Sequence, residues 1–207
     1  MLATGRRGTA TGNEAMDPLE ITAACFGLLC VWLVIRQNIW CWPTGLVMVS
    51  LYIIIFYQAR LYSDMGLQVV YIVLQVYGWW YWLRGGREAQ PPPVTRLSRG
   101  GWLLWPAVAL AGTAILGFAM HRYTDADLPY PDAATTVLSL IAQYLMARKI
   151  LESWLAWIIV DVLAIGIYLA KELHPTAVLY AVFLVLATMG LIAWTRSIQV
   201  RSAIAAA

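Results

Sequence analysis

Long apolar runs, cut by charged residues and prolines, are the feature that most limits what this chain can fold into. A membrane-spanning helix needs about 17–25 mainly apolar residues, and the sequence divides into seven runs of that order. Charged residues make up only 12% of the chain, about half the share that is typical of soluble domains. The sequence therefore predicts an all-α integral membrane protein, with the lipid bilayer as a partner. The expected helices are 20–36, 39–57, 66–83, 102–120, 132–147, 150–170 and 175–195.

An internal repeat organises these helices. Residues 20–84 align with residues 132–196 without a gap, at a constant offset of 112. The alignment pairs tryptophan, glycine and arginine with themselves, so apolar composition alone does not explain it. It predicts two three-helix repeats with one linking helix between them, which run parallel as in some transporters. The most informative pairs are Trp42/Trp154, Trp82/Trp194, Gly78/Gly190, Arg36/Arg148 and Arg84/Arg196.

The repeats define the expected domain organisation. The interruption in mid-chain carries two glycines, three consecutive prolines and several arginines, which is typical of a linker. The first residues are polar and rich in Gly, Thr and Ala, which predicts a disordered tail. The predicted parts are the N-terminal tail (1–18), the first repeat (19–84), a cytoplasmic linker (85–101), the linking helix (102–120), the second repeat (131–196) and a C-terminal tail (197–207).

Charge and cysteine content limit the partners. Nine of the fourteen Lys and Arg residues fall on the side of the linker and the C-terminus, so the positive-inside rule predicts a cytoplasmic C-terminus and an outside N-terminus. The net charge of +3 is small and scattered, which argues against a nucleic-acid partner. The three cysteines show no CxxC spacing, so no metal site or disulfide is expected. The sequence leaves the oligomeric state open, a homo-oligomer included.

The sixth expected helix carries a candidate binding face. Trp154, Trp157 and Asp161 are separated by three and then four positions, which places them on one side of a helix. An aspartate at mid-membrane depth costs about 2.5–3.5 kcal/mol on insertion scales, so it needs a partner, a cavity or a function. Aromatic rings beside a carboxylate suit a flat, cationic, hydrogen-bonding ligand. The same spacing also suits tryptophans that only pack between helices, and this alternative stays open.

Two further helices carry polar stripes. Gln68 and Gln75 lie in the third expected helix, and Thr136 and Gln143 lie in the fifth. An amide in lipid must find a partner or line a cavity, so these side chains either join helices or face a substrate. We expect Gln68, Thr136 and Gln143 to contribute to the site, and we expect Trp82 to anchor the third helix at the membrane interface.

Several short stretches resemble segments of a known protein family. They are residues 38–45, 61–62, 67–69, 77–82, 137–139, 146–149 and 152–157. In these stretches, and over residues 18–198 in general, the chain resembles the PnuC family of bacterial nicotinamide riboside transporters. The resemblance implies a seven-helix protein of the bacterial cytoplasmic (inner) membrane. It also implies uptake of nicotinamide riboside, an NAD precursor, by facilitated diffusion without a cofactor.

The resemblance also implies roles for single residues. Trp154 and Trp157 correspond to the family's WxxW and would sandwich the nicotinamide ring, while Gln68 would contact the polar groups of the substrate. Asp161 falls where relatives have asparagine, and the change keeps an acceptor but adds a charge that favours a pyridinium cation. We also expect Asn38, the first residue of the first matching stretch, to contact the substrate. Sister groups carry thiamine or other vitamins, so the choice of vitamin stays open.

Three other functions, a proton-coupled transporter, a membrane-embedded enzyme and a receptor, each require particular sequence features. A proton-coupled transporter would use Asp161 as its titrating group and would differ only in the driving force. A membrane-embedded enzyme needs a nucleophile, a base or metal ligands, but the two histidines fall in expected loops and no hydrolase or metalloprotease motif is present. A receptor would need an output domain, which the sequence does not show. The sequence therefore predicts a transporter with no catalytic residues.

Overall fold

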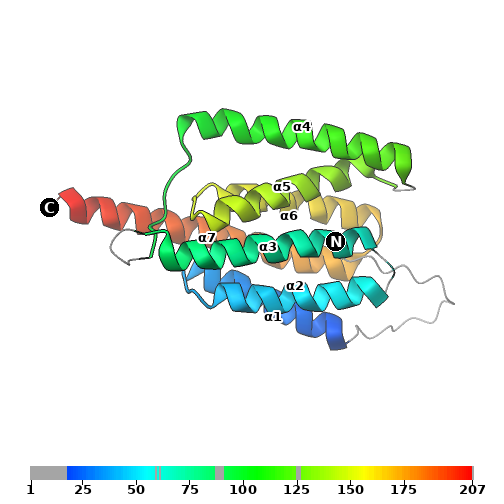
Figure 1. The fold of residues 1–207 in the computed structure, drawn as a ribbon, viewed down its shortest axis with the longest axis horizontal. Coiled ribbons are helices and arrows are strands. Elements are labelled where there is room, and N and C mark those ends of the chain that lie inside the picture. The colour runs from blue at the N-terminus through cyan, green and yellow to red at the C-terminus, as the bar shows by residue number, and fades with distance from the viewer. Residues whose placement is uncertain (1–17, 59, 61, 87–90, 125–126, 207) are drawn as a thin grey trace. The chain divides into compact units, whose positions relative to one another are not determined.

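The computed structural model describes residues 18–58, 60, 62–86, 91–124 and 127–206. Within these ranges it contains seven α-helices and one isolated parallel β-bridge, so the all-α prediction is confirmed (Figure 1). The helices are α1 (Pro18–Ile35), α2 (Cys41–Gln58), α3 (Tyr62–Arg84), α4 (Arg99–Tyr123), α5 (Pro129–Ala147), α6 (Ser153–Ala170) and α7 (His174–Ala206).

The helices are those of a multi-pass membrane protein. Among the described residues, five helices are long and apolar enough to cross a membrane, namely α1, α2, α4, α6 and α7. The other two, α3 and α5, are also long, with 23 and 19 residues. They are less apolar because they carry the amides and hydroxyls of the two polar stripes.

The chain forms two compact units, residues 1–79 and 80–207. In the first unit α1 packs against α2, and α2 packs against α3 through two glycines. A methyl group at Gly78 would overlap the ring of Trp42, and a methyl group at Gly45 would overlap the amide of Gln75. Glycine at these two positions lets the helices approach closely.

In the second unit α4 packs on α5, α5 on α6 and α6 on α7. The α6–α7 contact repeats a feature of the first unit, because a methyl group at Gly190 would overlap the ring of Trp154. Trp194 then contacts Trp154 edge-on, with ring centroids 5.5 Å apart, and Trp82, with centroids 6.2 Å apart. Trp82 is only 2% exposed. Its expected role as an interfacial anchor was therefore wrong, because the side chain is enclosed by protein.

The turns of the two units also match. Among the described residues, four that are not glycine have positive φ, namely Gln37 (53°), Arg60 (58°), Lys149 (53°) and Glu172 (57°). Gln37 and Lys149 are related by the offset of the sequence repeat, and so are Arg60 and Glu172. A left-handed conformation costs roughly 1–2 kcal/mol per residue, so two unrelated loops would not be expected to share it at equivalent positions. These matches support a duplicated three-helix unit.

Several helix boundaries differ from those expected from apolar runs. α7 continues to Ala206, through the predicted C-terminal tail, because alanine, arginine and glutamine form helices as readily as apolar residues do. α4 begins at Arg99, where the Ser98 hydroxyl accepts a hydrogen bond from the Gly101 amide at 3.1 Å. α3 begins at Tyr62 with Asp64 in its first turn, where a negative charge favours the helix. The predicted disordered tail lies outside the described residues, apart from Pro18.

The Trp154–Gly190 contact leads to a stability prediction. We expect Gly190→Ala to lower the melting temperature in detergent, because the added methyl group meets a rigid, buried indole, and overpacking costs about 1–3 kcal/mol. The gain in helix propensity, about 1 kcal/mol, offsets only part of this. The matched control is Gly166→Ala in α6, where an added methyl group meets nothing within 4 Å. An unchanged or raised melting temperature for Gly190→Ala would contradict the contact.

Candidate functional site

The candidate site is built around Asp161 in α6. Its side chain is 3% exposed and makes no hydrogen bond or ion pair with any residue that the structure describes. A buried carboxylate is costly unless it is paired or hydrogen-bonded. The arrangement therefore favours a cation or a hydrogen-bond donor from outside the protein.

Trp157 lies one turn before Asp161 on the same helix. Its side chain is only partly buried, so the surrounding protein leaves some of the indole surface accessible. Because residues four apart project from the same side of a helix, the indole and the carboxylate lie on one face. This face offers a ring to stack on and an acceptor for a charged or hydrogen-bonding group.

Trp154, the other predicted stacking residue, is held by protein contacts. It is 1% exposed, it covers Gly190, and Trp194 meets it at 87°. Its indole N–H has no hydrogen-bond partner among the described residues. These contacts favour packing between α6 and α7, the alternative that the spacing alone had left open.

Helix α5 contributes amide and hydroxyl groups beside α6. Gln143 is 9% exposed and makes no hydrogen bond to a described residue, so its amide can still donate and accept. Thr136 is partly buried, two turns earlier. Asp132, at the start of α5, is engaged elsewhere, in an ion pair with Lys171 at 3.4 Å. Since α5 packs against α6, the predicted residues of these two helices belong to one part of the second unit.

The remaining predicted residues belong to the first unit. Gln68 is partly buried in α3. Asn38 is exposed in the turn between α1 and α2, where its Oδ1 accepts a hydrogen bond from the Trp40 amide at 3.0 Å. The Asn38 side chain thus stabilises the turn before α2. The structure brings Thr136, Gln143 and the α6 residues together within one unit, and it leaves Gln68 and Asn38 in the other.

Gln75 is more constrained than the sequence suggested. It is 4% exposed and lies against Gly45. Through the repeat offset, Gly45 corresponds to Trp157, and Gln75 corresponds to Ala187, which is 3% exposed. The first repeat therefore has a small residue on its second helix and a large one on its third, and the second repeat has the reverse. The alignment of the repeats was the signal that identifies this exchange.

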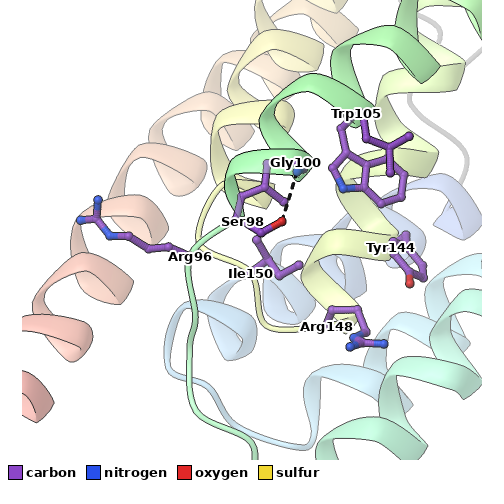
Figure 2. A pocket seen from close by; sticks show the side chains of 10 residues that line it. Arg96, Ser98, Gly100, Trp105, Tyr144, Arg148 and Ile150 are labelled. Carbon is purple, nitrogen blue, oxygen red and sulfur yellow. Dashed lines mark hydrogen bonds between the residues drawn. The ribbon is translucent and has the colours of Figure 1, made fainter.

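A surface pocket of about 550 Å³ lies beside the start of α4. Trp105 and Tyr144 pack together on its wall, with ring centroids 5.4 Å apart. Figure 2 shows that the side chains of Arg96 and Arg148 point away from one another. None of the predicted site residues lines this pocket. Because its charged groups do not converge on one point, we do not assign the substrate to it.

Comparisons with known proteins identify the family of the chain. The family model described as nicotinamide mononucleotide transporter matches residues 17–196. The nicotinamide riboside transporter PnuC of Escherichia coli (strain K12) is 27% identical, over 92% of this chain and 90% of the relative. PnuC of Neisseria mucosa is 31% identical, over 87% and 73%. The riboflavin/roseoflavin transporter RibM of Streptomyces davaonensis is 29% identical, over 84% and 83%.

A solved structure agrees as well. The crystal structure of the vitamin B3 transporter PnuC superposes with a TM-score of 0.71 and 31% identity, and covers 87% of this chain and 82% of that one. The family model spans nearly all of the helical part of the chain. The chain therefore belongs to the PnuC family, whose model is described as the nicotinamide mononucleotide transporter.

Proposed function

We propose that the protein transports nicotinamide riboside across the cytoplasmic membrane of a bacterium. The observation that carries the proposal is the buried carboxylate of Asp161, without a partner among the described residues and on the same face as Trp157. The nicotinamide ring of the riboside is a flat pyridinium cation, which a carboxylate and an indole can bind together. The names of the PnuC relatives point to the same substrate.

The proposed architecture is seven spans, in which α3 and α5 cross the membrane with the five more apolar helices. The first and second three-helix repeats run parallel, and α4 links them. Support comes from the equivalent positive-φ turns and from the Trp–Gly contact in each repeat. The excess of positive charge on one side favours a cytoplasmic C-terminus and an outside N-terminus.

Each site residue has a proposed role. Trp157 stacks on the nicotinamide ring, and Asp161 balances its charge. Gln143 and Thr136 hydrogen-bond the carboxamide and the ribose hydroxyls. Gln68 and Asn38 belong to the first unit, and their contacts with the substrate stay predictions from the sequence. Trp154 borders the site and sets the spacing of α6 and α7.

The transport mechanism follows from these roles. The substrate moves down its gradient by facilitated diffusion, and the site is reached from either side in turn. Since the substrate is moved and not altered, the mechanism needs no catalytic residue and no cofactor. A proton-coupled variant would require Asp161 to titrate during the cycle.

A flavin is the second candidate substrate, because RibM is 29% identical over 84% of this chain. Riboflavin also has a flat ring, but the ring is neutral and larger than nicotinamide. A charge-balancing carboxylate therefore favours the riboside over the flavin. Thiamine is a cation as well, so the carboxylate alone does not separate it from the riboside.

Titration calorimetry on the purified protein in detergent tests the substrate. We expect nicotinamide riboside to bind, and we expect nicotinamide, riboflavin, thiamine and nicotinamide mononucleotide to bind more weakly or not at all. Binding of riboflavin or thiamine in place of the riboside would keep the fold and change the cargo. Binding of none of these compounds would contradict the proposed site.

A further inference from the structure

Residues 91–98, which precede α4, are held by contacts within the second unit and are not a loose linker. Thr95 forms the isolated parallel bridge with Ile150. The Thr95 amide donates to the Lys149 carbonyl at 3.0 Å, and the Leu151 amide donates to the Thr95 carbonyl at 2.9 Å. We call residues 91–98 the strap. It joins the turn between α5 and α6 as one short added strand.

Two charged side chains hold the strap on either side of this bridge. The Glu152 carboxylate accepts a hydrogen bond from the Leu97 amide at 2.8 Å. Arg201, near the end of α7, donates to the Val94 carbonyl at 3.2 Å. Hydrogen bonds that involve an ionised group are stronger than neutral ones. Glu152 is 9% exposed and Arg201 is exposed, so water competes less for the Leu97–Glu152 bond than for the Val94–Arg201 bond.

The equivalent turn of the first repeat has the same backbone hydrogen bonds but a different side-chain contact. There the Asn38 side chain accepts the Trp40 amide within the turn itself. Through the repeat offset, Trp40 corresponds to Glu152, so the first repeat has no carboxylate at the position of the strap contact. The strap is thus an addition to the second repeat, which also carries Trp157 and Asp161.

The strap acts where α6 begins. Glu152 immediately precedes α6, so the Leu97–Glu152 bond holds the first turn of the helix that carries Trp157. Next to the strap, Lys149 is 3% exposed, with its Nζ 4.2 Å from the centre of the Trp82 ring. On another side, Leu97 and Ser98 border the open pocket of Figure 2. The strap therefore packs against the turn between α5 and α6 and also borders an open pocket.

We propose that the strap gates this end of the second repeat, and that Glu152 is a positioning residue whose bond to Leu97 breaks and re-forms in each transport cycle. The inference rests on the proposed transport function. While the bond is made, the turn before α6 and the start of α4 are tied together. When it breaks, the start of α6 can move away from α4, and the substrate can leave on this side.

A disulfide across the bridge tests the gate. Thr95→Cys and Ile150→Cys are combined with Cys25→Ala, since Cys25 is an exposed cysteine. Neighbouring strands lie about 4.8 Å apart, within the range of about 4.4–6.8 Å between the Cα atoms of a disulfide. In vesicles we expect oxidation to reduce riboside uptake to the level of empty vesicles, and reductant to restore it. The two single-cysteine variants should not respond. Full uptake with the disulfide formed would overturn the proposal.

Variants of Glu152 test the positioning role. We expect Glu152→Ala to lower the maximal uptake rate, to leave the KM for the riboside unchanged, and to speed the labelling of a Leu97→Cys probe by a water-soluble thiol reagent. Glu152→Gln keeps an acceptor oxygen without the charge, so its values should lie between those of the parent and the alanine variant. Labelling at the parent rate in both variants would overturn the proposal.

The labelling experiment needs no substrate, so it tests the role of Glu152 in the strap separately from the proposed transport function. If vesicles with the parent protein take up no riboside, the proposed function is wrong. Faster labelling of the Leu97→Cys probe in Glu152→Ala would still support a strap that Glu152 holds, and an unchanged rate would contradict it.

Discussion

Replacing Trp157 with alanine is expected to reduce riboside uptake strongly at low substrate concentration and to leave the protein folded. The ring is partly exposed, so its loss removes little packing. Stacking of a flat heterocycle on an aromatic side chain contributes about 1–3 kcal/mol, and this corresponds to roughly a 5- to 150-fold loss of affinity. Calorimetry and vesicle uptake measure the loss, and circular dichroism confirms the fold.

The neighbouring tryptophan provides the matched comparison. Trp154 is 1% exposed and covers Gly190, so Trp154→Ala is expected to lower stability by about 3–5 kcal/mol. Trp157→Phe keeps a ring and should retain most of the affinity. Full uptake by Trp157→Ala, together with a folded and inactive Trp154→Ala, would move the stacking role to Trp154.

Replacing Asp161 with asparagine is expected to change binding and stability in opposite directions. The riboside should bind about 10- to 100-fold more weakly, because a charge pair in a site that excludes water is lost. The empty protein should unfold at the same or a higher temperature, because a buried carboxylate without a described partner has been removed. Calorimetry and thermal unfolding of the same preparation measure both effects.

The charge of the ligand provides the control for Asp161. The reduced, dihydropyridine form of the riboside has nearly the same shape but no positive charge. We expect Asp161→Asn to reduce its binding much less than that of the oxidised riboside. Full riboside uptake by Asp161→Asn would contradict both the charge-pairing role and the proton-coupled alternative.

The helices and their order were predictable because a membrane span must be long and apolar. The seven helices lie where the apolar runs lie, and the repeat alignment paired turns that share a left-handed residue, as at Gln37 and Lys149. The helix ends were less predictable. α7 extends beyond the apolar run, because alanine, arginine and glutamine continue a helix as readily as apolar residues do.

Part of the candidate site could not be read from the sequence. Trp154 and Trp157 are three residues apart and share a helix face, so spacing could not distinguish a ring that packs against Gly190 from one that is partly accessible. The strap was also missed. Its three consecutive prolines are typical of a linker, and the pairing of Thr95 with Ile150 joins positions far apart in the chain.

The two repeats have opposite residue sizes at two equivalent positions, and this difference bears on cargo preference. Both copies of the three-helix unit kept tryptophan against glycine, at Trp42/Gly78 and Trp154/Gly190. At the positions of Gly45 and Gln75, the second copy has Trp157 and Ala187 instead. The two copies therefore agree at the positions that maintain helix spacing and differ at the position of Trp157, a proposed substrate contact. Because these two sets of positions are separate, we expect that a change at the second set alters cargo preference without loss of the helix packing that the first set maintains.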